Sequence, residues 1–143
     1  MLMAPIEPPL PRASYRIVRL LRRWAAGADL GPGRMASLVA LGKGIGVEPM
    51  AAVALASLFQ LTESCLGRPL VAECCCSPRL SRDERAILAL LAVDLPPHPH
   101  QASPSSIPHG LPGALVWAVA SVRRFLGEPI APRPVAGCPF APG

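Results

Sequence analysis

Three consecutive cysteines, Cys74, Cys75 and Cys76, are the residues of this chain whose type and spacing come closest to a chemical site. Zinc and iron–sulfur sites place several thiolates around one centre, usually with two or more residues between the members of a pair. In an extended segment Cys74 and Cys76 share a face, whereas in a helix the three side chains fan out around the axis. A metal site therefore needs further ligands. The candidates are Cys65, Cys138, His98, His100 and His109.

Three interpretations of the cysteines are open at this point: a zinc or iron–sulfur site, thiol redox or persulfide chemistry, and burial as small apolar side chains. Burial is favoured, because free cysteine is among the most buried residue types. The chain has 5 cysteines, an odd number, and neighbouring cysteines close only a strained ring, so a disulfide framework is not expected. We expect thiols in a reducing compartment, the cytoplasm. The metal interpretation would use Cys65, Cys74, Cys75 and Cys76.

Two carboxylates lie near the cysteines in the sequence and are possible metal ligands or general bases. Glu63 falls late in a predicted helix, after the apolar run has ended at Gln60. Glu73 directly precedes the cysteines. The favoured interpretation is structural: Glu63 simply follows the end of the apolar run in its helix, and Glu73 is solvated or pairs with Arg68 or Arg79.

Arginines form a stripe along the first predicted helix. On a helical wheel they gather on one side, with Ile17, Leu21 and Trp24 opposite. The stripe consists of Arg12, Arg16, Arg19 and Arg23. Nucleic acid is a disfavoured partner, because no interleaved aromatic residues, helix-turn-helix pattern or zinc-finger spacing accompany the arginines. An acidic protein partner fits the charge, and a solvated face is the simplest interpretation.

Searches for catalytic motifs return nothing. Gly42-Lys43-Gly44 lacks the earlier glycine and the following Ser or Thr of a phosphate-binding loop, so it predicts a turn. There is no Gly-x-Ser-x-Gly or His-Glu-x-x-His motif, and every histidine lies in one proline-rich segment. The sequence therefore favours a chain that is not an enzyme.

Five helices are predicted around these residues. They cover residues 14–26, with Ser14 as cap, 33–41, 49–66, 82–93 and 112–126. Ser81 and Glu84 form a capping box at the start of the fourth helix. The third helix starts with Pro49 and is the candidate for the buried centre. Residues 70–76 are ambiguous between an extended segment and a helical turn.

Composition predicts one folded domain. The chain has 143 residues, of which 51% are apolar, 16% charged and 4% aromatic, with a net charge of +5. These values favour a mainly aliphatic core over disorder. Uninterrupted apolar runs are too short to span a bilayer, and the N-terminus lacks a secretory pattern. The predicted organisation is a proline-rich arm (1–12), a helical domain (13–127) with a proline-rich loop (94–112), and a proline-rich tail (128–143).

The segment from Cys74 to Leu88, Cys-Cys-Cys-Ser-Pro-Arg-Leu-Ser-Arg-Asp-Glu-Arg-Ala-Ile-Leu, resembles a segment of small uncharacterised alphaproteobacterial proteins. Those proteins pair a triple cysteine with a nearby arginine, a hydroxyl residue and Asp-Glu before an apolar helix. In this chain one additional residue separates the cysteines from the arginine. The resemblance implies a bacterial, cytoplasmic origin and no particular activity.

Together these observations predict an all-α fold, an irregular bundle of four to five helices. The predicted function is a non-catalytic protein-interaction or regulatory module, with an acidic partner or a second copy on its surface. The predicted interaction residues are Arg12, Arg16, Arg19, Arg23, Trp117 and Arg124. The alternative is a thiol-based metal-binding or redox protein centred on Cys74, Cys75 and Cys76, with zinc or an iron–sulfur cluster as its cofactor.

Overall fold

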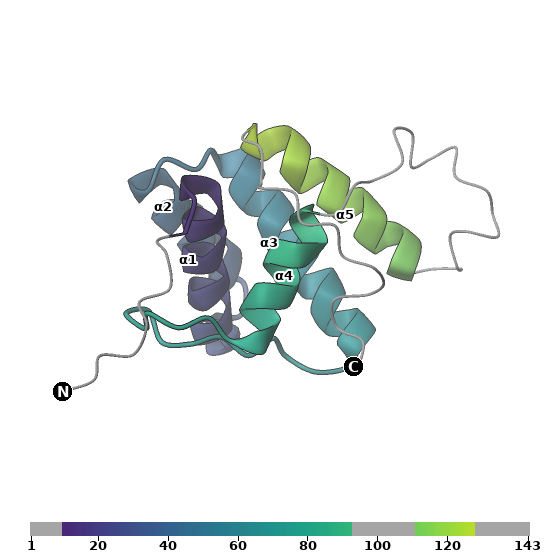
Figure 1. Ribbon diagram of the computed structural model, residues 1–143, viewed down its shortest axis with the longest axis horizontal. Helices are drawn as coiled ribbons and strands as arrows, with labels where there is room; N and C mark the ends of the chain where they lie inside the picture. Colours follow the sequence, from purple (N-terminus) through teal and green to yellow (C-terminus); the bar gives the residue numbers. More distant parts are fainter. Residues whose placement is uncertain (1–9, 93–110, 128–143) are drawn as a thin grey trace.

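The predicted helices are present, and the chain is all-α over the residues that the structure describes. The computed structural model describes residues 10–92 and 111–127. Its helices are α1 (Arg12–Ala26), α2 (Gly33–Gly44), α3 (Pro49–Leu66), α4 (Arg82–Ala92) and α5 (Leu111–Leu126), with a short 3-10 helix at Ala28–Leu30. No strand occurs within these two ranges, which confirms the predicted fold class (Figure 1).

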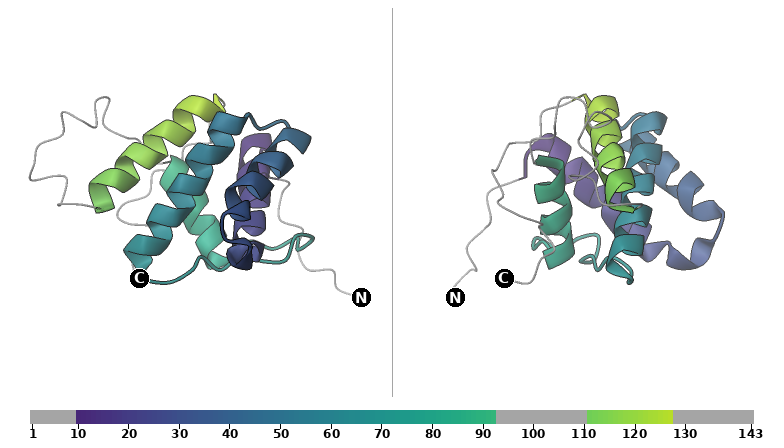
Figure 2. Two further views of the ribbon diagram at one scale, coloured as in Figure 1. Left: turned by 180° about the vertical axis from the view of Figure 1, so that it is seen from behind. Right: turned by 90° about the vertical axis from the view of Figure 1, so that its right-hand side faces the viewer.

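Helix α3 lies at the centre of the bundle, as predicted. Pro49 occupies its first turn, where a missing N–H costs no hydrogen bond, and Gly67 ends it in the left-handed conformation, with φ of 69°. Helix α5 packs along one side of α3, while α1 and α2 pack on another side (Figures 1 and 2). Helix α4 contacts α1 and α5, so it closes the bundle on the remaining side.

The core is aliphatic apart from two aromatic side chains, Phe59 and Trp24. Fully buried side chains come from α1 to α5, and each contributes roughly 1.5 to 3 kcal/mol. On α5 the predicted inward stripe is confirmed, because Ala118, Val119 and Val122 are buried and Leu115 and Leu126 pack against the core. The largest fully buried apolar side chains are Phe59, Ile17, Leu20, Leu21, Leu38, Leu55, Leu58, Ile87, Leu91, Val119 and Val122.

The capping box at the start of α4 is confirmed in both directions. The Glu84 N–H donates to Ser81 Oγ at 3.0 Å, and the Ser81 N–H donates to Glu84 Oε1 at 2.7 Å. Two backbone donors that the helix leaves without partners are therefore satisfied.

Two predicted helix limits are wrong by about a turn or less. Helix α1 begins at Arg12 rather than at Ser14, and no side chain caps it; Ser14 lies inside the helix and is buried. Helix α2 continues to Gly44 instead of ending at Leu41. The missing side chain of Gly42 explains the continuation, since a Cβ there would lie 3.3 Å from the Val47 carbonyl oxygen and 3.5 Å from Ala52 Cβ. Gly42 thus permits a close approach rather than breaking the helix.

The predicted proline-rich segments fall largely outside the described residues. This applies to the arm at 1–12, the loop at 94–112 and the tail at 128–143, and with them to His98, His100, His109 and Cys138. The domain limits stay a prediction.

Helix α3 is the one helix among the described residues that is long and apolar enough to cross a membrane by length and composition. The prediction from sequence considered only uninterrupted apolar runs and did not single it out. The core helix of a soluble protein passes the same test. Since α3 contacts α1, α2 and α5, we describe it as a core helix.

Candidate functional site

The segment Gly67–Ser81, which we call the cysteine loop, connects α3 to α4 and runs beneath α1 (Figure 1). It contains neither helix nor strand, which resolves the ambiguity at residues 70–76 in favour of irregular structure. An irregular backbone cannot satisfy its own polar groups, so other elements must supply partners.

Arg22 of α1 holds the second half of the cysteine loop. Its side chain donates to Glu84 Oε2 at 2.7 Å, to the Arg79 carbonyl at 2.8 Å and to the Ser77 carbonyl at 3.0 Å. Glu84 is fully buried and Arg22 is nearly so. The hydrogen bond that Arg22 donates to Glu84 raises the pKa of Arg22, so the guanidinium stays protonated in this buried position. One buried ion pair thus joins α1, α4 and the loop.

Two carboxylates hold the first half of the loop. Glu63 on α3 accepts the Leu70 N–H at 2.8 Å and the Trp24 indole N–H at 3.1 Å. Asp83 on α4 accepts the Val71 N–H at 2.7 Å and forms a two-bond ion pair with Arg68, at 2.7 and 3.0 Å. Glu63 therefore has a structural role, since it joins the start of the cysteine loop to Trp24 of α1.

Arg68 pairs with Asp83 and not with Glu73, which was expected to be solvated or to pair with Arg68 or Arg79. The reason is that Asp83 lies close to Arg68. It stands in the first turn of α4, beside the start of the cysteine loop, and is itself buried. A buried carboxylate needs a cation more than a partly exposed one does.

The free energy of unfolding is expected to fall as the pH drops below about 4, in part through Asp83. The hydrogen bonds from Arg68 and from the Val71 N–H lower the pKa of Asp83, against the opposing effect of burial. A carboxylate with a folded pKa below its unfolded value, about 3.9, contributes stability that is complete above the unfolded pKa. That contribution is lost as pH falls through the folded pKa. Urea unfolding over a pH series measures it.

Asp83→Asn is the matched variant for this prediction. It should be less stable at neutral pH and should show a flatter dependence of stability on pH in the acidic range. An acid slope as steep in Asp83→Asn as in the parent would mean that other carboxylates carry the effect.

The predicted burial of the cysteines is wrong, because Cys65, Cys74, Cys75 and Cys76 are all exposed and free. The cause lies in the anchoring of the loop: its backbone groups turn inward to Glu63, Asp83 and Arg22, so the cysteine side chains at its tip turn outward. Cys75 Sγ lies 3.5 Å from Cys76 Sγ. Interaction with Cys75 raises the pKa of Cys76, since two neighbouring thiols do not both ionise readily.

The four-cysteine metal interpretation finds no assembled site. Among the residues of ranges 10–92 and 111–127, no group of three or more His, Cys, Asp or Glu side chains is arranged to hold a metal ion. Cys65 lies near the end of α3 and is not part of the cysteine loop. Within the described part of the chain the structure therefore offers a thiol pair and not a four-ligand cage.

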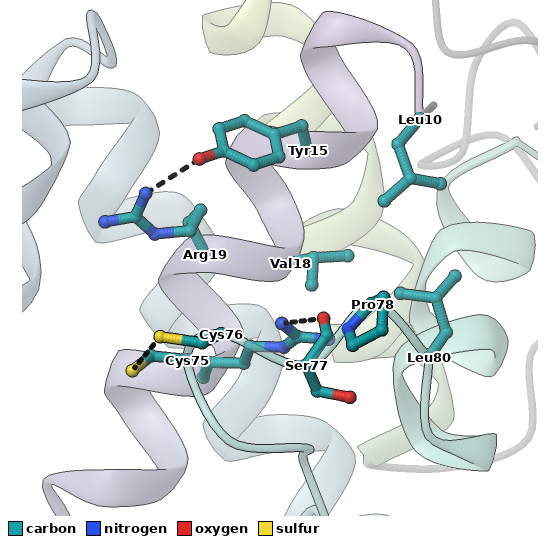
Figure 3. A pocket seen from close by; sticks show the side chains of 10 residues that line it. Leu10, Tyr15, Val18, Arg19, Cys75, Cys76, Ser77, Pro78 and Leu80 are labelled. Carbon is teal, nitrogen blue, oxygen red and sulfur yellow. Dashed lines mark hydrogen bonds between the residues drawn. The ribbon is translucent and has the colours of Figure 1, made fainter. Parts of the chain in front are cut away.

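A surface hollow of about 420 Å³ separates α1 from the cysteine loop. Figure 3 shows Arg19 and the two sulfur atoms toward one end of it and apolar side chains toward the other. Arg19 Nη1 donates to Tyr15 Oη at 2.8 Å, which orients the guanidinium at the rim. The lining residues are Leu10, Tyr15, Val18, Arg19, Arg22, Cys75, Cys76, Ser77, Pro78 and Leu80. The hollow combines soft sulfur donors, the guanidinium groups of Arg19 and Arg22, and an apolar wall.

The predicted arginine stripe is only partly exposed. Arg12 and Arg23 are exposed and Arg19 is half-buried, but Arg16 is 9% exposed, so its place on a solvated face is wrong. The turn between α2 and α3 covers Arg16. Gly46 in this turn has φ of 80°, and a Cβ there would lie 2.7 Å from Arg16 Nη2. The positive φ favours glycine at this position.

The remaining predicted interaction residues lie on α5. Trp117 is 49% exposed, and Arg124 is exposed, with its guanidinium 5.9 Å from the centre of the Phe125 ring. They lie on a different helix from the arginine stripe. An interaction role for either surface stays a prediction.

Comparisons with protein-family models, with curated proteins and with solved structures found no match to this chain.

Proposed function

We propose that this chain is a non-catalytic regulatory module whose functional element is the Cys75–Cys76 thiol pair. One observation carries the proposal: two exposed sulfur atoms lie 3.5 Å apart at the rim of a hollow. Two thiols at this distance form a bidentate ligand for thiol-seeking molecules. Irregular loops held by a rigid scaffold are common carriers of binding residues.

The way in which the loop is held supports the proposal. A buried ion pair such as Arg22–Glu84 adds little net stability, because the desolvation of both charges offsets their attraction. Its effect here is on position, since Arg22 also binds the carbonyls of Ser77 and Arg79. The pair therefore determines where the residues next to Cys76 lie. Such anchoring matters if the thiols must meet a ligand in a defined geometry.

The proposal includes the reducing, bacterial-type cytoplasm expected from the sequence, because only reduced thiols act as ligands. The free state of the described cysteines supports it. Arg12, Arg23 and Trp117 are exposed, which is compatible with the predicted acidic partner or second copy. No contact of the described residues assigns an occupant to those surfaces, so the thiol pair is the function we propose.

Phenylarsine oxide tests the proposal, because one arsenic atom replaces two thiol protons and releases its oxygen as water. We expect the folded protein to bind one arsenic per chain, and peptide mapping to place it on Cys75 and Cys76. The Cys76→Ser variant should lose this adduct, whereas Cys65→Ser, which removes an exposed cysteine on α3, should retain it. Binding only after unfolding, or at other cysteines, would exclude the thiol pair as the functional element.

A further inference from the structure

The distance between the Cys75 and Cys76 sulfur atoms determines the bond angle of an atom that bridges them. The two sulfur atoms lie 3.5 Å apart. For sulfur bonds of about 2.3 Å, the length in zinc sites and close to that of arsenic–sulfur bonds, the angle at the bridging atom is about 100°. A disulfide would instead bring the sulfur atoms to about 2.0 Å, and adjacent cysteines close only a strained ring. The pair is therefore spaced for an atom that bonds two sulfurs at a bent angle.

Bond angle and valence together restrict which atom can occupy the pair. A two-coordinate metal ion bonds two sulfurs in a nearly straight line, which does not fit this angle. Structural zinc sites and iron–sulfur clusters take four protein ligands, and across residues 10–92 and 111–127 no group of three or more suitable side chains is placed to hold a metal ion. Trivalent arsenic forms three covalent bonds, and its lone pair compresses the angles between them to slightly less than tetrahedral. Two thiols and one oxygen atom therefore complete its valence at the angle that the pair offers.

The hollow beside the pair supplies a partner for the third bond of arsenic. In arsenous acid this bond carries a hydroxyl group, whose oxygen accepts hydrogen bonds. The Arg19 guanidinium lies at the same end of the hollow as the two sulfur atoms (Figure 3). A guanidinium has more N–H donors than its bond to Tyr15 Oη uses. Arg22 also lines the hollow, but its donors bind Glu84 and two loop carbonyls, so Arg19 is the residue placed to donate to the ligand.

We propose that Cys75 and Cys76 bind inorganic trivalent arsenic, with both sulfur atoms bonded to arsenic and Arg19 donating to the remaining hydroxyl group. Each thiol proton combines with one hydroxyl group of arsenous acid and leaves as water. Two As–O and two S–H bonds break, while two As–S and two O–H bonds form. No electrons are transferred, so arsenic stays trivalent. The inference rests on the proposed function and names the ligand class of the same thiol pair.

Equilibrium dialysis of the full chain against sodium arsenite, followed by elemental analysis, tests the site. It is done without oxygen and with a phosphine reductant, because a dithiol reductant would itself take the arsenic. The background variant Cys65→Ser/Cys74→Ser/Cys138→Ser keeps only the pair, and we expect it to hold one arsenic per chain. The matched variant Cys75→Ser/Cys76→Ser keeps the other three cysteines and should hold none stoichiometrically.

Arg19→Met in the background variant tests the hydrogen bond to the ligand, because arsenite and phenylarsine oxide differ at the third bond of arsenic. In the phenylarsine oxide adduct a phenyl ring takes the place of the hydroxyl group and offers no oxygen to Arg19. We expect arsenite to bind about tenfold more weakly, as loss of an outer partner of a bound metal does, and phenylarsine oxide to bind as before. Equal weakening of both reagents would show a structural role of Arg19 and overturn its assignment.

The comparison of the two reagents also separates the inference from the proposed function. Equal arsenite binding by the background and matched variants overturns the inference, and so does stoichiometric Zn²⁺ that arsenite does not displace from the background variant. A phenylarsine oxide adduct on the pair without arsenite binding overturns the inorganic arsenic site and leaves the proposed function standing. Loss of both adducts overturns the proposed function as well.

Discussion

An Arg22→Met variant is expected to lose about 3 to 5 kcal/mol of its free energy of unfolding, a large share of the total for a domain of this size. The substitution leaves the Glu84 carboxyl group fully buried and without its cation. It also removes the donors to the Ser77 and Arg79 carbonyls. Urea unfolding followed by circular dichroism measures the loss.

The matched control for this prediction is the double variant Arg22→Met/Glu84→Leu. Replacing both partners by apolar side chains removes the unpaired charge, so the double variant should recover a substantial part of the stability. It does not recover all of it, since Glu84 also accepts the Ser81 N–H. A single variant that loses under about 1 kcal/mol would show that the pair is not desolvated in solution.

The double variant also separates the effect of Arg22 on the position of the cysteine loop from its effect on the free energy of unfolding. It should fold, yet its loop lacks the guanidinium that binds Ser77 and Arg79, so the sulfur atoms lose their fixed separation. We therefore expect weaker chelation of phenylarsine oxide at Cys75 and Cys76 while single-thiol reagents still label both. Retained chelation at the parent affinity would mean that the loop keeps its shape without Arg22.

The features that were predicted correctly depend on signals a few residues apart. The capping box needs only Ser81 and Glu84, and both limits of α3 follow from Pro49 and Gly67. The inward stripe of α5 follows from the helical period alone. Such signals act in the same way whatever the rest of the fold does, because they concern one helix and its own backbone.

The features that were missed depend on contacts between distant segments. Arg22 and Glu84 are 62 residues apart, and nothing near either residue announces the ion pair. One signal was present: Arg22 lies one turn after Val18, outside the arginine stripe, on a side of α1 that faces the cysteine loop. Arg16 fails for a related reason, because a helical wheel does not show that the turn at Gly46 crosses its face.

The cysteines show how a residue-type preference yields to backbone anchoring. Free cysteine is usually buried, and the preference favoured burial here. The anchors of the loop bind its backbone and not its side chains, so burial of the backbone groups and exposure of the thiols arise together. The loop thereby presents the sulfur atoms of Cys74, Cys75 and Cys76 at the surface.

The second large effect is expected for Phe59→Ala in α3. Phe59 is fully buried, and its ring centre lies 6.2 Å from the ring centre of Trp24. Trp24 belongs to α1 and also contacts α2. The Arg34 guanidinium lies 3.5 Å from the centre of the Trp24 ring and donates to its carbonyl oxygen. Truncation leaves a cavity where α1 and α3 meet, and the expected loss is about 3 to 5 kcal/mol.

Met50→Ala is the matched control on the same helix, because Met50 is 55% exposed and its truncation should change stability by less than about 0.5 kcal/mol. Urea unfolding measures both variants, and Trp24 fluorescence in a Trp117→Phe background reports on the cavity. If the two truncations cost the same, α3 does not form the core. We expect a large loss of stability in Phe59→Ala alone, while its folded fraction still chelates arsenic. This result would show that the packing of the bundle and the anchoring of the cysteine loop are separate. The bundle depends on apolar burial around α3, whereas the loop depends on charged anchors at its edge.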